Sequence, residues 1–414
     1  MAQGRNRPSV LFQFELIDLV WISIIMPSLR SLLRRQLRKI PGVVPLWRLI
    51  KKMPRYRILR LVGHATFPIF GRQMPLRGYY ARMSDYLKGD NGYSIDLGSR
   101  LSTDRSAPSH FGAPESLVAV VPRGRSLYDC GVVVSPDHRL LADVSGDGES
   151  PPQAHFAMHK ILLPPVRRIA GKVAVMSALR PNNYYHWMFD ILPRFELLQT
   201  SGLDPDYYLI NTEAQFQKET LRILGIPADR IVNPTPDTHV EADELFVPSL
   251  RGPTFRGSPQ FQACRYLRST FLGHDAGSKP HRALYVTRSD AHNRRVVNER
   301  EIEEELLDFG FEVVSLTGVP FLRQVELFSQ ARIVVGPHGA GFTNAVFCQP
   351  GSTLIEFWPQ GHTVDCFKRL AGFVGMEYHV VVGTKSNGGS DGYVAYGDHV
   401  VDRGALRSLL RQVA

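Results

Sequence analysis

The hydrophobic pattern of the chain is most regular between residues 280 and 385, where short apolar runs alternate with longer amphipathic ones. The short runs are typical of buried strands, and the amphipathic runs of about 10–13 residues are typical of helices. In chain order these runs are RALYVTR, NEREIEEELLDFG, FEVVSL, FLRQVELFSQA, RIVVG, GFTNAVFC, STLIEFW, TVDCFKRLAGFVG and EYHVVV. Strands that alternate with helices indicate a parallel sheet with βαβ crossovers. Asn298 is expected to open the helix NEREIEEELLDFG, and Gly310 to follow its end.

The first half of the chain has a more mixed pattern. Over residues 117–144 short apolar runs predict strands, and SPDHR has the chemistry of a turn between two of them. The stretch RPNNYYHWMFDILPRFELLQ has apolar residues at helical spacing, and Pro193 is expected to bend or restart that helix. YYLIN, AQFQKETLRILG and ELFVPS then predict a strand, a helix and a strand.

The chain length favours more than one domain. Single hydrophobic cores usually stop growing at about 250–300 residues, and this chain has 414. A polar linker at 273–279 separates the two halves. We therefore predict an N-terminal segment over residues 1–75, an α/β domain over 76–274 and a second α/β domain over 275–414.

Composition adds one localised feature, a basic N-terminal segment. With 43% hydrophobic and 21% charged residues the chain is an ordinary globular protein, but its net charge is +10. Residues 1–60 hold thirteen Lys or Arg against Glu15 and Asp18, so this segment carries +11 and the rest of the chain −1. The globular body is therefore not expected to bind nucleic acid.

The apolar stretch LIDLVWISIIMPSL within this segment is too short for a spanning helix, which needs about 20 apolar residues. It contains Asp18 and Pro27, and it lacks a small-residue cleavage site, so a signal peptide is not expected. Next to clustered arginines, the stretch favours a segment lying on an anionic membrane face, although a helix packed on the body has the same pattern. Four widely spaced cysteines favour a reduced, cytosolic compartment.

The most informative motif is VVGPHGAGFTNAVFC, where a predicted strand runs into glycines and then into a helix. Ligands of open parallel sheets bind beyond the carboxyl ends of the strands. Gly336, Gly339 and Gly341 allow positive φ or a close backbone approach, and His338 adds a donor. Backbone N–H groups at the helix start favour an anion there. A bare tight turn is the alternative.

Two further strand ends carry polar residues. TRSDAHNRRVVNE places Arg288, Arg294 and Arg295 just beyond a strand, and guanidinium groups suit phosphate because they bind two oxygens at once. A solvated basic loop would have the same composition. Glu356 lies in the otherwise apolar strand STLIEFWP, and burying its carboxylate requires a partner, either sugar hydroxyls or one of the arginines.

In the first half, NNYYHWMFDILPR places His186 and Asp190 four residues apart, on one face of a helix. A carboxylate that orients an imidazole is the usual construction of a general base. The pair is equally compatible with a structural hydrogen bond. Tyr184, Tyr185 and Trp187 are more typical of a core or an interface than of a ligand platform.

Other chemistries match the sequence poorly. DPD at 204–206 has the form of a metal-holding DxD motif, but it precedes a predicted strand and is expected to be a surface turn. There is no GxSxG, HExxH or Walker motif, and no GxGxxG fingerprint with its acidic partner, so a Rossmann oxidoreductase is not expected.

The motifs NNYYHWMFDILPR, LYVTRSDAHNRRVVNE and VVGPHGAGFTNAVFCQPGSTLIEFWP together resemble glycosyltransferase family 61. The resemblance covers roughly residues 115–385, in order as well as in kind. It implies a GT-B arrangement, in which two Rossmann-like domains face a cleft. It also implies inverting sugar transfer from a nucleotide-sugar donor, such as a UDP-sugar, without an essential metal or other cofactor. Phe342 is one departure from the family pattern, because leucine is usual there.

The resemblance also implies roles for individual residues. The family positions are matched by His338, Gly339, Ala340 and Gly341 in a diphosphate loop, by Arg288 and Arg294 in a basic loop, and by Asn183, His186 and Asp190 in an N-x-x-H-x-x-x-D motif. We further expect Thr343 or Asn344 to extend the phosphate contacts, Glu356 to hold ribose, and Asn183 and Tyr185 to contact the acceptor. His186 is the expected base, with Asp190 as the competitor. The acceptor is expected to be a glycan or lipid-linked glycan in bacterial capsule-type polysaccharide synthesis, at the cytoplasmic face of the plasma membrane. A non-catalytic nucleotide- or glycan-binding protein is the alternative.

Overall fold

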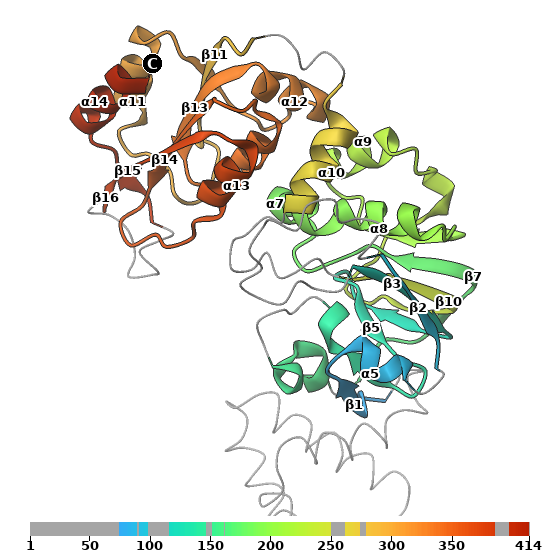
Figure 1. Ribbon diagram of the computed structural model, residues 1–414. Coiled ribbons are helices and arrows are strands. Elements are labelled where there is room, and N and C mark those ends of the chain that lie inside the picture. Colours follow the sequence, from blue (N-terminus) through green and yellow to red (C-terminus); the bar gives the residue numbers. More distant parts are fainter. Residues whose placement is uncertain are drawn as a thin grey trace, which may run out of the picture. The chain divides into compact units, whose positions relative to one another are not determined.

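The computed structural model describes residues 74–88, 91–97, 116–145, 151–160, 162–249, 261–273, 279–385 and 397–413. Residues 77–155 and 167–414 form one compact unit that contains the two large sheets (Figure 1). A second unit consists of residues 1–76 and 156–166 and includes the short 3-10 helix Phe156–His159. The predicted membrane-associating segment over 1–75 lies almost wholly outside the described residues, and its role stays a prediction. No helix in the described part of the chain is long and apolar enough to cross a membrane.

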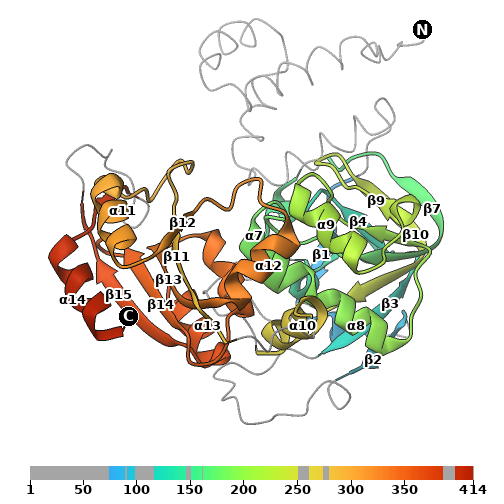
Figure 2. The ribbon, with the colours of Figure 1, turned by 90° about the horizontal axis from the view of Figure 1, so that it is seen from above.

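The second half of the chain builds a five-stranded, all-parallel sheet in the order β12-β11-β13-β14-β15. Its strands are β11 (Arg282–Val286), β12 (Glu312–Val314), β13 (Ala331–Pro337), β14 (Thr353–Trp358) and β15 (Glu377–Val382). Helices cover both faces, α11 (Glu299–Asp308) and α14 (Arg403–Val413) on one, α12 (Phe321–Ser329) and α13 (Cys366–Val374) on the other (Figures 1 and 2). The parallel sheet with βαβ crossovers that the sequence predicts is confirmed.

Alternation along the strands separates two cores. Ile333 and Val335 of β13 join the apolar cluster that includes Leu306 of α11, whereas Val334 joins the cluster that includes Phe328 of α12 and Phe367 of α13. Successive side chains of a strand point to opposite faces, so a strand covered on both faces reads as a continuous apolar run. This explains why RIVVG and TLIEFW show no polar alternation.

The asparagine that was expected to open α11 has a different role in the structure. Asn298 does precede α11, but its side chain makes no capping hydrogen bond. Instead its amide donates to the carbonyl of Val401 at 2.9 Å and accepts from the N–H of Val401 at 3.0 Å. Asn298 therefore fixes a distant segment rather than the helix start. Gly310 follows the helix end with φ of 77°, as expected for a left-handed stop.

The first half builds a ten-stranded mixed sheet. The main path runs β1-β6-β5-β4-β10-β7-β8-β9, and β3 joins it through β10 with β2 beside it. The strands are β1 (Gly78–Tyr80), β2 (Tyr93–Asp96), β3 (Leu117–Pro122), β4 (Arg125–Leu127), β5 (Val132–Val134), β6 (Arg139–Leu141), β7 (Arg167–Val175), β8 (Tyr207–Leu209), β9 (Ile231–Val232) and β10 (His239–Pro248). The pairings among β7, β8, β9 and β10 are parallel, while β3, β4 and β5 pair antiparallel. The α/β class is confirmed, and the GT-B arrangement and the predicted domain boundaries stay predictions.

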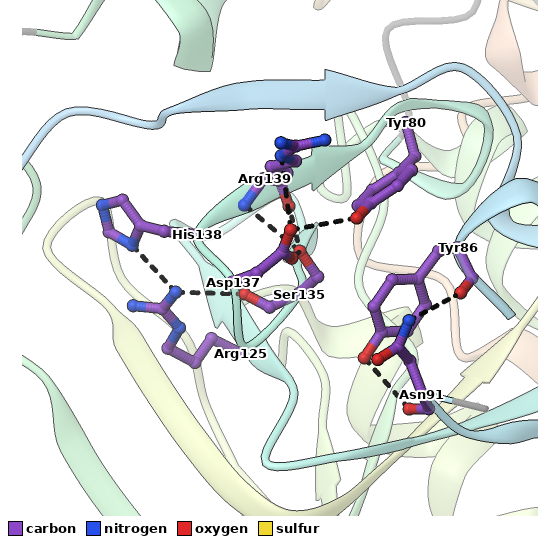
Figure 3. A network of polar contacts seen from close by, with 8 residues as sticks. All are labelled: Tyr80, Tyr86, Asn91, Arg125, Ser135, Asp137, His138 and Arg139. Carbon is purple, nitrogen blue, oxygen red and sulfur yellow. Dashed lines mark hydrogen bonds and ion pairs between the residues drawn. The ribbon is translucent and has the colours of Figure 1, made fainter. Parts of the chain in front are cut away.

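The SPDHR turn forms between β5 and β6 as predicted, within a polar network (Figure 3). The Ser135 hydroxyl contacts Asp137, and the Tyr80 hydroxyl donates to the other Asp137 oxygen at 2.9 Å. His138 adopts a positive φ of 70°, and its ring nitrogen lies 2.8 Å from the buried guanidinium of Arg125. Arg125 also donates to the carbonyl of Ser135, so this turn is held from β4 as well as by its own residues.

The helical motif of the first half begins just after β7. It comprises α7 (Tyr184–His186), a π-helical turn (Trp187–Ile191) and α8 (Pro193–Ser201). Proline lacks an N–H, so it starts α8, which confirms the predicted restart. Further along lie α9 (Gln215–Ile223) and α10 (Phe261–Phe271), and one continuous apolar cluster extends from these helices to α12 and α13.

Candidate functional site

The predicted His186–Asp190 pair forms in the structure. Nδ1 of His186 lies 2.7 Å from Oδ2 of Asp190, and the two side chains are 13% and 15% exposed. Both follow the carboxyl end of β7, where the sheet's geometry favours a ligand. The π-helical turn between them closes with an i→i−5 bond from the N–H of Leu192 to the carbonyl of Trp187, at 3.0 Å. Such turns often occur at functional sites.

A buried arginine anchors this turn to the sheet. Arg194 is 3% exposed and donates to the carbonyls of Ser177 at 2.9 Å and Asp190 at 3.2 Å. Burial lowers the pKa of Arg194 to about 10, which still leaves it charged at neutral pH. The guanidinium thus ties the backbone beneath Asp190 to the segment that leaves β7. Arg194 lies within the motif we read from the sequence, but only its burial reveals this role.

The glycine-rich loop follows β13, and the 3-10 helix Ala340–Phe347 starts directly behind it. Gly339 has φ of 179°, an extended backbone that any residue adopts. A Cβ atom on Gly339 would lie 1.9 Å from Nη1 of Arg288, so a side chain there would displace this guanidinium. Gly336 is constrained by the backbone, since its Cβ would lie 2.5 Å from the carbonyl oxygen of Val286 on β11. The predicted close backbone approach is therefore the reason for Gly336.

Arg288 lies against this loop, and Asp290 lines the same pocket without forming an ion pair with it. Its guanidinium donates only long hydrogen bonds, to the backbone and side-chain oxygens of Asn293 at 3.3 and 3.4 Å. Of the residues that the structure describes, none contributes a carboxylate to an ion pair with it, and its buried Nε has no partner. Burial and the nearby charge of Arg294 lower the pKa of Arg288. Arg294 adopts φ of 56°, a rare conformation for non-glycine residues that concentrates at functional sites.

His338 belongs to a second histidine–carboxylate pair. Its Nδ1 contacts one oxygen of Glu356, and the hydroxyl of Tyr378 donates to the other Glu356 oxygen at 2.5 Å. The Glu356 carboxylate is fully buried, and its predicted contact with a sugar or an arginine stays a prediction. Burial lowers the pKa of His338, as do the charges of Arg294 and Arg288, although Glu356 opposes this effect. Both arginines therefore lie close to the imidazole.

Three of these buried side chains could also hold a metal ion. The ligand atoms of His338, Glu356 and His362 lie within 4.8 Å of one another, and the two imidazole rings are 4.0 Å apart between centroids. Histidine nitrogens and a carboxylate are the donors that zinc accepts. Here, however, the Glu356 oxygens are hydrogen-bonded to His338 and Tyr378, and Nε2 of His362 lies 3.0 Å from the Val364 carbonyl. Metal binding would therefore replace part of an existing hydrogen-bond network.

The remaining predicted site residues are buried or serve the backbone. Thr343 and Asn344 are fully buried, and the Asn344 side chain accepts from Tyr184 and donates to Gln324. A phosphate contact by Asn344 would break one of these hydrogen bonds. Asn183 accepts from the N–H groups of Tyr185 and His186 at 3.0 and 3.4 Å, so it caps α7. The Tyr185 hydroxyl is buried without a partner among the described residues. The predicted ligand contacts of these residues stay predictions.

A pocket of about 100 Å³ opens where β11, β12 and β13 end. Arg288, Gly339 and Gly341 line it, as the motifs indicate, and so do Asp290 and Thr317. We did not predict the contribution of Thr317, although the same strand-end argument applies to the segment after β12. Tyr378 and His362 were missed as well, and no local pattern distinguishes them.

Residues 184–355 match the family model described as Glycosyltransferase 61. This confirms the resemblance and covers both the His186–Asp190 motif and the glycine loop. A beta-1,2-xylosyltransferase of Arabidopsis thaliana is 26% identical over 139 residues, which are 28% of this chain and 26% of that protein. A mouse (Mus musculus) protein O-linked-mannose beta-1,4-N-acetylglucosaminyltransferase 2 is 30% identical over 126 residues, 29% of this chain and 22% of that protein. A second beta-1,2-xylosyltransferase, from Oryza sativa subsp. japonica, is 29% identical over 23% of this chain and 16% of its own length. The chain thus spans about a quarter or less of these relatives.

Proposed function

We propose that this chain, which carries a glycosyltransferase 61 domain over residues 184–355, transfers a sugar from a nucleotide-sugar donor to a glycan acceptor. The observation that carries the proposal is Arg288, a partly buried cation that packs against Gly339 before the start of a helix and makes no ion pair within the described part of the chain. Guanidinium groups and the N–H groups at a helix start both suit the oxygens of a diphosphate. The relatives are named as xylosyl- and N-acetylglucosaminyltransferases, which supports sugar transfer, and we expect the donor to be UDP-linked.

The donor half of the proposed mechanism is electrostatic. The diphosphate rests on the N–H groups at the start of the 3-10 helix, with Arg288 and Arg294 beside it. As the bond between the anomeric carbon and the diphosphate oxygen breaks, its electron pair stays on that oxygen, and the two guanidinium groups stabilise the growing charge. We expect these cations to make a divalent metal unnecessary.

The acceptor half centres on His186. Asp190 occupies Nδ1, so Nε2 takes the proton of the acceptor hydroxyl, while the acceptor oxygen attacks the anomeric carbon from the side opposite the leaving group. One displacement of this kind inverts the configuration of that carbon. Asp190 itself is the competing base.

Calorimetric titration with UDP, GDP and CMP, each with and without EDTA, tests the proposal. We expect one nucleotide to bind whether or not EDTA is present, and Arg288→Ala to weaken that binding about 10- to 100-fold, because hydrogen bonds to charged groups contribute about 1.5–3 kcal/mol. Arg300→Ala is the matched control, since Arg300 is exposed and, within the described ranges, its ion pair is with Glu304 on its own helix. Binding that needs a metal would contradict the metal-free site. No binding of any nucleotide would favour the non-catalytic glycan-binding alternative.

The proposed cellular setting is the cytoplasmic face of the plasma membrane, with a lipid-linked glycan of a cell-surface polysaccharide such as a bacterial capsule as acceptor. The basic segment over residues 1–60 supports this location. Full-length protein should sediment with vesicles of phosphatidylserine and phosphatidylcholine, and not with phosphatidylcholine alone. Replacing Arg34, Arg35 and Arg38 with Gln should weaken that binding more than tenfold, at about 1 kcal/mol for each charge. Unchanged sedimentation would contradict the membrane role.

A further inference from the structure

One hydrogen bond directly joins the two predicted halves of the site. The hydroxyl of Tyr184 donates to Oδ1 of Asn344 at 2.6 Å, although the two residues are 160 positions apart. Tyr184 stands two residues before His186 in α7. Asn344 stands three residues after Gly341, in the 3-10 helix that carries the glycine loop. The bond therefore connects α7, which carries the proposed base His186, with the 3-10 helix that follows the proposed diphosphate loop.

Both ends of this bond are held firmly. Asn344 is fully buried, and its amide nitrogen donates to Oε1 of Gln324 on α12 at 2.8 Å. Gln324 in turn donates to the carbonyl of Val319 at 2.8 Å. On the other side, the Tyr184 ring packs edge-on against Phe216, with 5.1 Å between ring centroids. Burial raises the pKa of the Tyr184 phenol, so the hydroxyl keeps its proton and remains the donor.

We propose that Tyr184 and Asn344 form a positioning pair, which fixes the His186–Asp190 base relative to the diphosphate loop and transmits nucleotide binding from that loop to α7. The inference rests on the proposed function and gives Asn344 a role beneath the loop instead of a direct phosphate contact. Neither side chain needs to touch a substrate. Because the hydrogen bond joins the two elements, a movement of the loop would move α7 as well.

A bond of this kind matters because direct displacement requires the attacking oxygen, the anomeric carbon and the leaving oxygen to be aligned. The base orients the first of these atoms and the diphosphate loop the last. A misplacement of about 1 Å between the two can reduce the rate about 100-fold. A purely structural bond would act otherwise, since its loss would lower stability and leave the activity of the folded enzyme unchanged.

The direct test is Tyr184→Phe, which removes the hydroxyl and keeps the ring on Phe216. We expect the dissociation constant for UDP to stay within about twofold of wild type, whereas the kcat for transfer from a UDP-sugar falls about tenfold or more. Hydrolysis of the donor without acceptor, which does not need the base to be aligned with a sugar hydroxyl, should fall far less. Tyr86→Phe is the matched control, because its buried hydroxyl donates to the carbonyl of Asn91 at 3.0 Å, in a segment that none of the site motifs contains.

A second readout does not depend on turnover. UDP should protect the amides of residues 184–192 from hydrogen exchange in the wild type and in Tyr86→Phe, and this protection should be lost in Tyr184→Phe. The transfer defects of Tyr184→Phe and Asn344→Ala should also be non-additive, so that the double variant is no slower than the worse single variant.

Different results would overturn the proposed positioning pair and the proposed glycosyltransferase function. If Tyr184→Phe binds UDP, transfers sugar within twofold of wild type and keeps the UDP-induced protection, the bond is merely structural. If UDP affinity falls as far as transfer does, the bond serves donor binding and not alignment. If the wild type binds no nucleotide, the proposed function itself fails and takes this inference with it.

Discussion

Two histidine–carboxylate pairs of this protein, His186–Asp190 and His338–Glu356, are chemically alike and structurally opposite. His186 and Asp190 lie four residues apart on one helical motif, and both remain partly exposed beyond β7. His338 directly follows β13, Glu356 lies in the neighbouring strand β14, and Glu356 is completely buried. The first pair can exchange a proton with an incoming hydroxyl. The second can do so only through the outer edge of His338, because Tyr378 and the sheet enclose its carboxylate.

Burial changes what such a pair contributes. A partly exposed pair can exchange its hydrogen bonds with water, so its loss is expected to affect chemistry more than folding. A buried carboxylate with two donors leaves those donors unsatisfied when it is removed. We therefore expect the first pair to be important for turnover and the second for stability and for the shape of the diphosphate loop.

The largest expected effect concerns the exposed pair. His186→Ala should reduce transfer about 10²- to 10⁴-fold, the usual contribution of a general base, while the dissociation constant for UDP stays within about twofold. Steady-state kinetics and calorimetry on the same preparation measure both quantities. Transfer at the wild-type rate would reject His186 as the base. A larger loss in Asp190→Ala than in His186→Ala would favour Asp190 instead.

Lowering the pH should destabilise the folded protein through His362, whose ring packs against His338 of the buried pair. Burial and the neighbouring His338 lower the pKa of His362 to about 4, below the usual value of about 6.5 in an unfolded chain. Between these two pH values the unfolded state binds a proton that the folded state does not. The stabilisation is therefore complete above pH 6.5 and is lost as the pH falls to about 4, by up to about 3 kcal/mol for this histidine.

Chemical denaturation of the wild type and of His362→Gln at pH 7.5 and 4.5 measures this effect. The variant should lose less of its free energy of unfolding between the two pH values. His399, which is fully buried and whose pKa burial likewise lowers to about 4, remains in both proteins and gives a common background. An equal pH dependence in the two proteins would show that His362 does not contribute.

Removing one carboxylate at a time compares the pairs directly. Glu356→Ala should lower the free energy of unfolding by about 3 kcal/mol, because it leaves two buried donors, on His338 and Tyr378, without an acceptor. Asp190→Ala should lower it by about 1 kcal/mol, because water can replace the carboxylate at a partly exposed site. Urea titration without nucleotide measures both variants. Equal losses would contradict the contrast drawn between the pairs.

The smallest expected effect is that of Gly339→Ala, which adds one methyl group to the glycine loop beside His338. In Gly339→Ala the new methyl group occupies the position of the Arg288 guanidinium, so that side chain must swing away while the extended backbone is unstrained. We expect UDP affinity to fall about tenfold, at the low end for a lost charge-assisted contact, with little change in stability. Gly372→Ala is the control, because its Cβ would point into open space within α13. Unchanged UDP affinity in Gly339→Ala would mean that Arg288 does not bind the diphosphate from this position.

The exposed pair could be predicted from the sequence and the buried pair could not. A spacing of four residues in a helical pattern is enough to bring His186 to Asp190, since one helix turn decides the contact. No spacing relates His338 to Glu356, because their approach depends on how β13 and β14 pair. The register that sets Gly336 beside Glu356 brings the two side chains together. We accordingly recognised that Glu356 needs a partner, but the sequence did not identify His338 and Tyr378, and the expected ribose contact stays a prediction.

The same distinction holds for the fold. Strong local periodicity predicted the parallel sheet of the second half, the turn between β5 and β6 and the restart at Pro193. The mixed order of the first sheet was not predicted, because the chain passes from β4 to β10 across more than a hundred residues. Asn298 is a further example of a contact that the local sequence does not decide, because its side chain bonds the backbone of Val401 and does not cap the nearby helix start.

What the sequence determined by itself is the alternation of strands and helices over residues 280–385, the glycine loop, the basic loop and the local His186–Asp190 pair. Each of these is encoded within one or two turns of chain, where side-chain periodicity and backbone preference act directly. What only the tertiary structure decided is which buried polar groups meet: His338 with Glu356 and Tyr378, Arg288 with Gly339, and Tyr184 with Asn344. A buried polar atom must find a partner, but strand order and register select it, and those depend on the packing of the whole core.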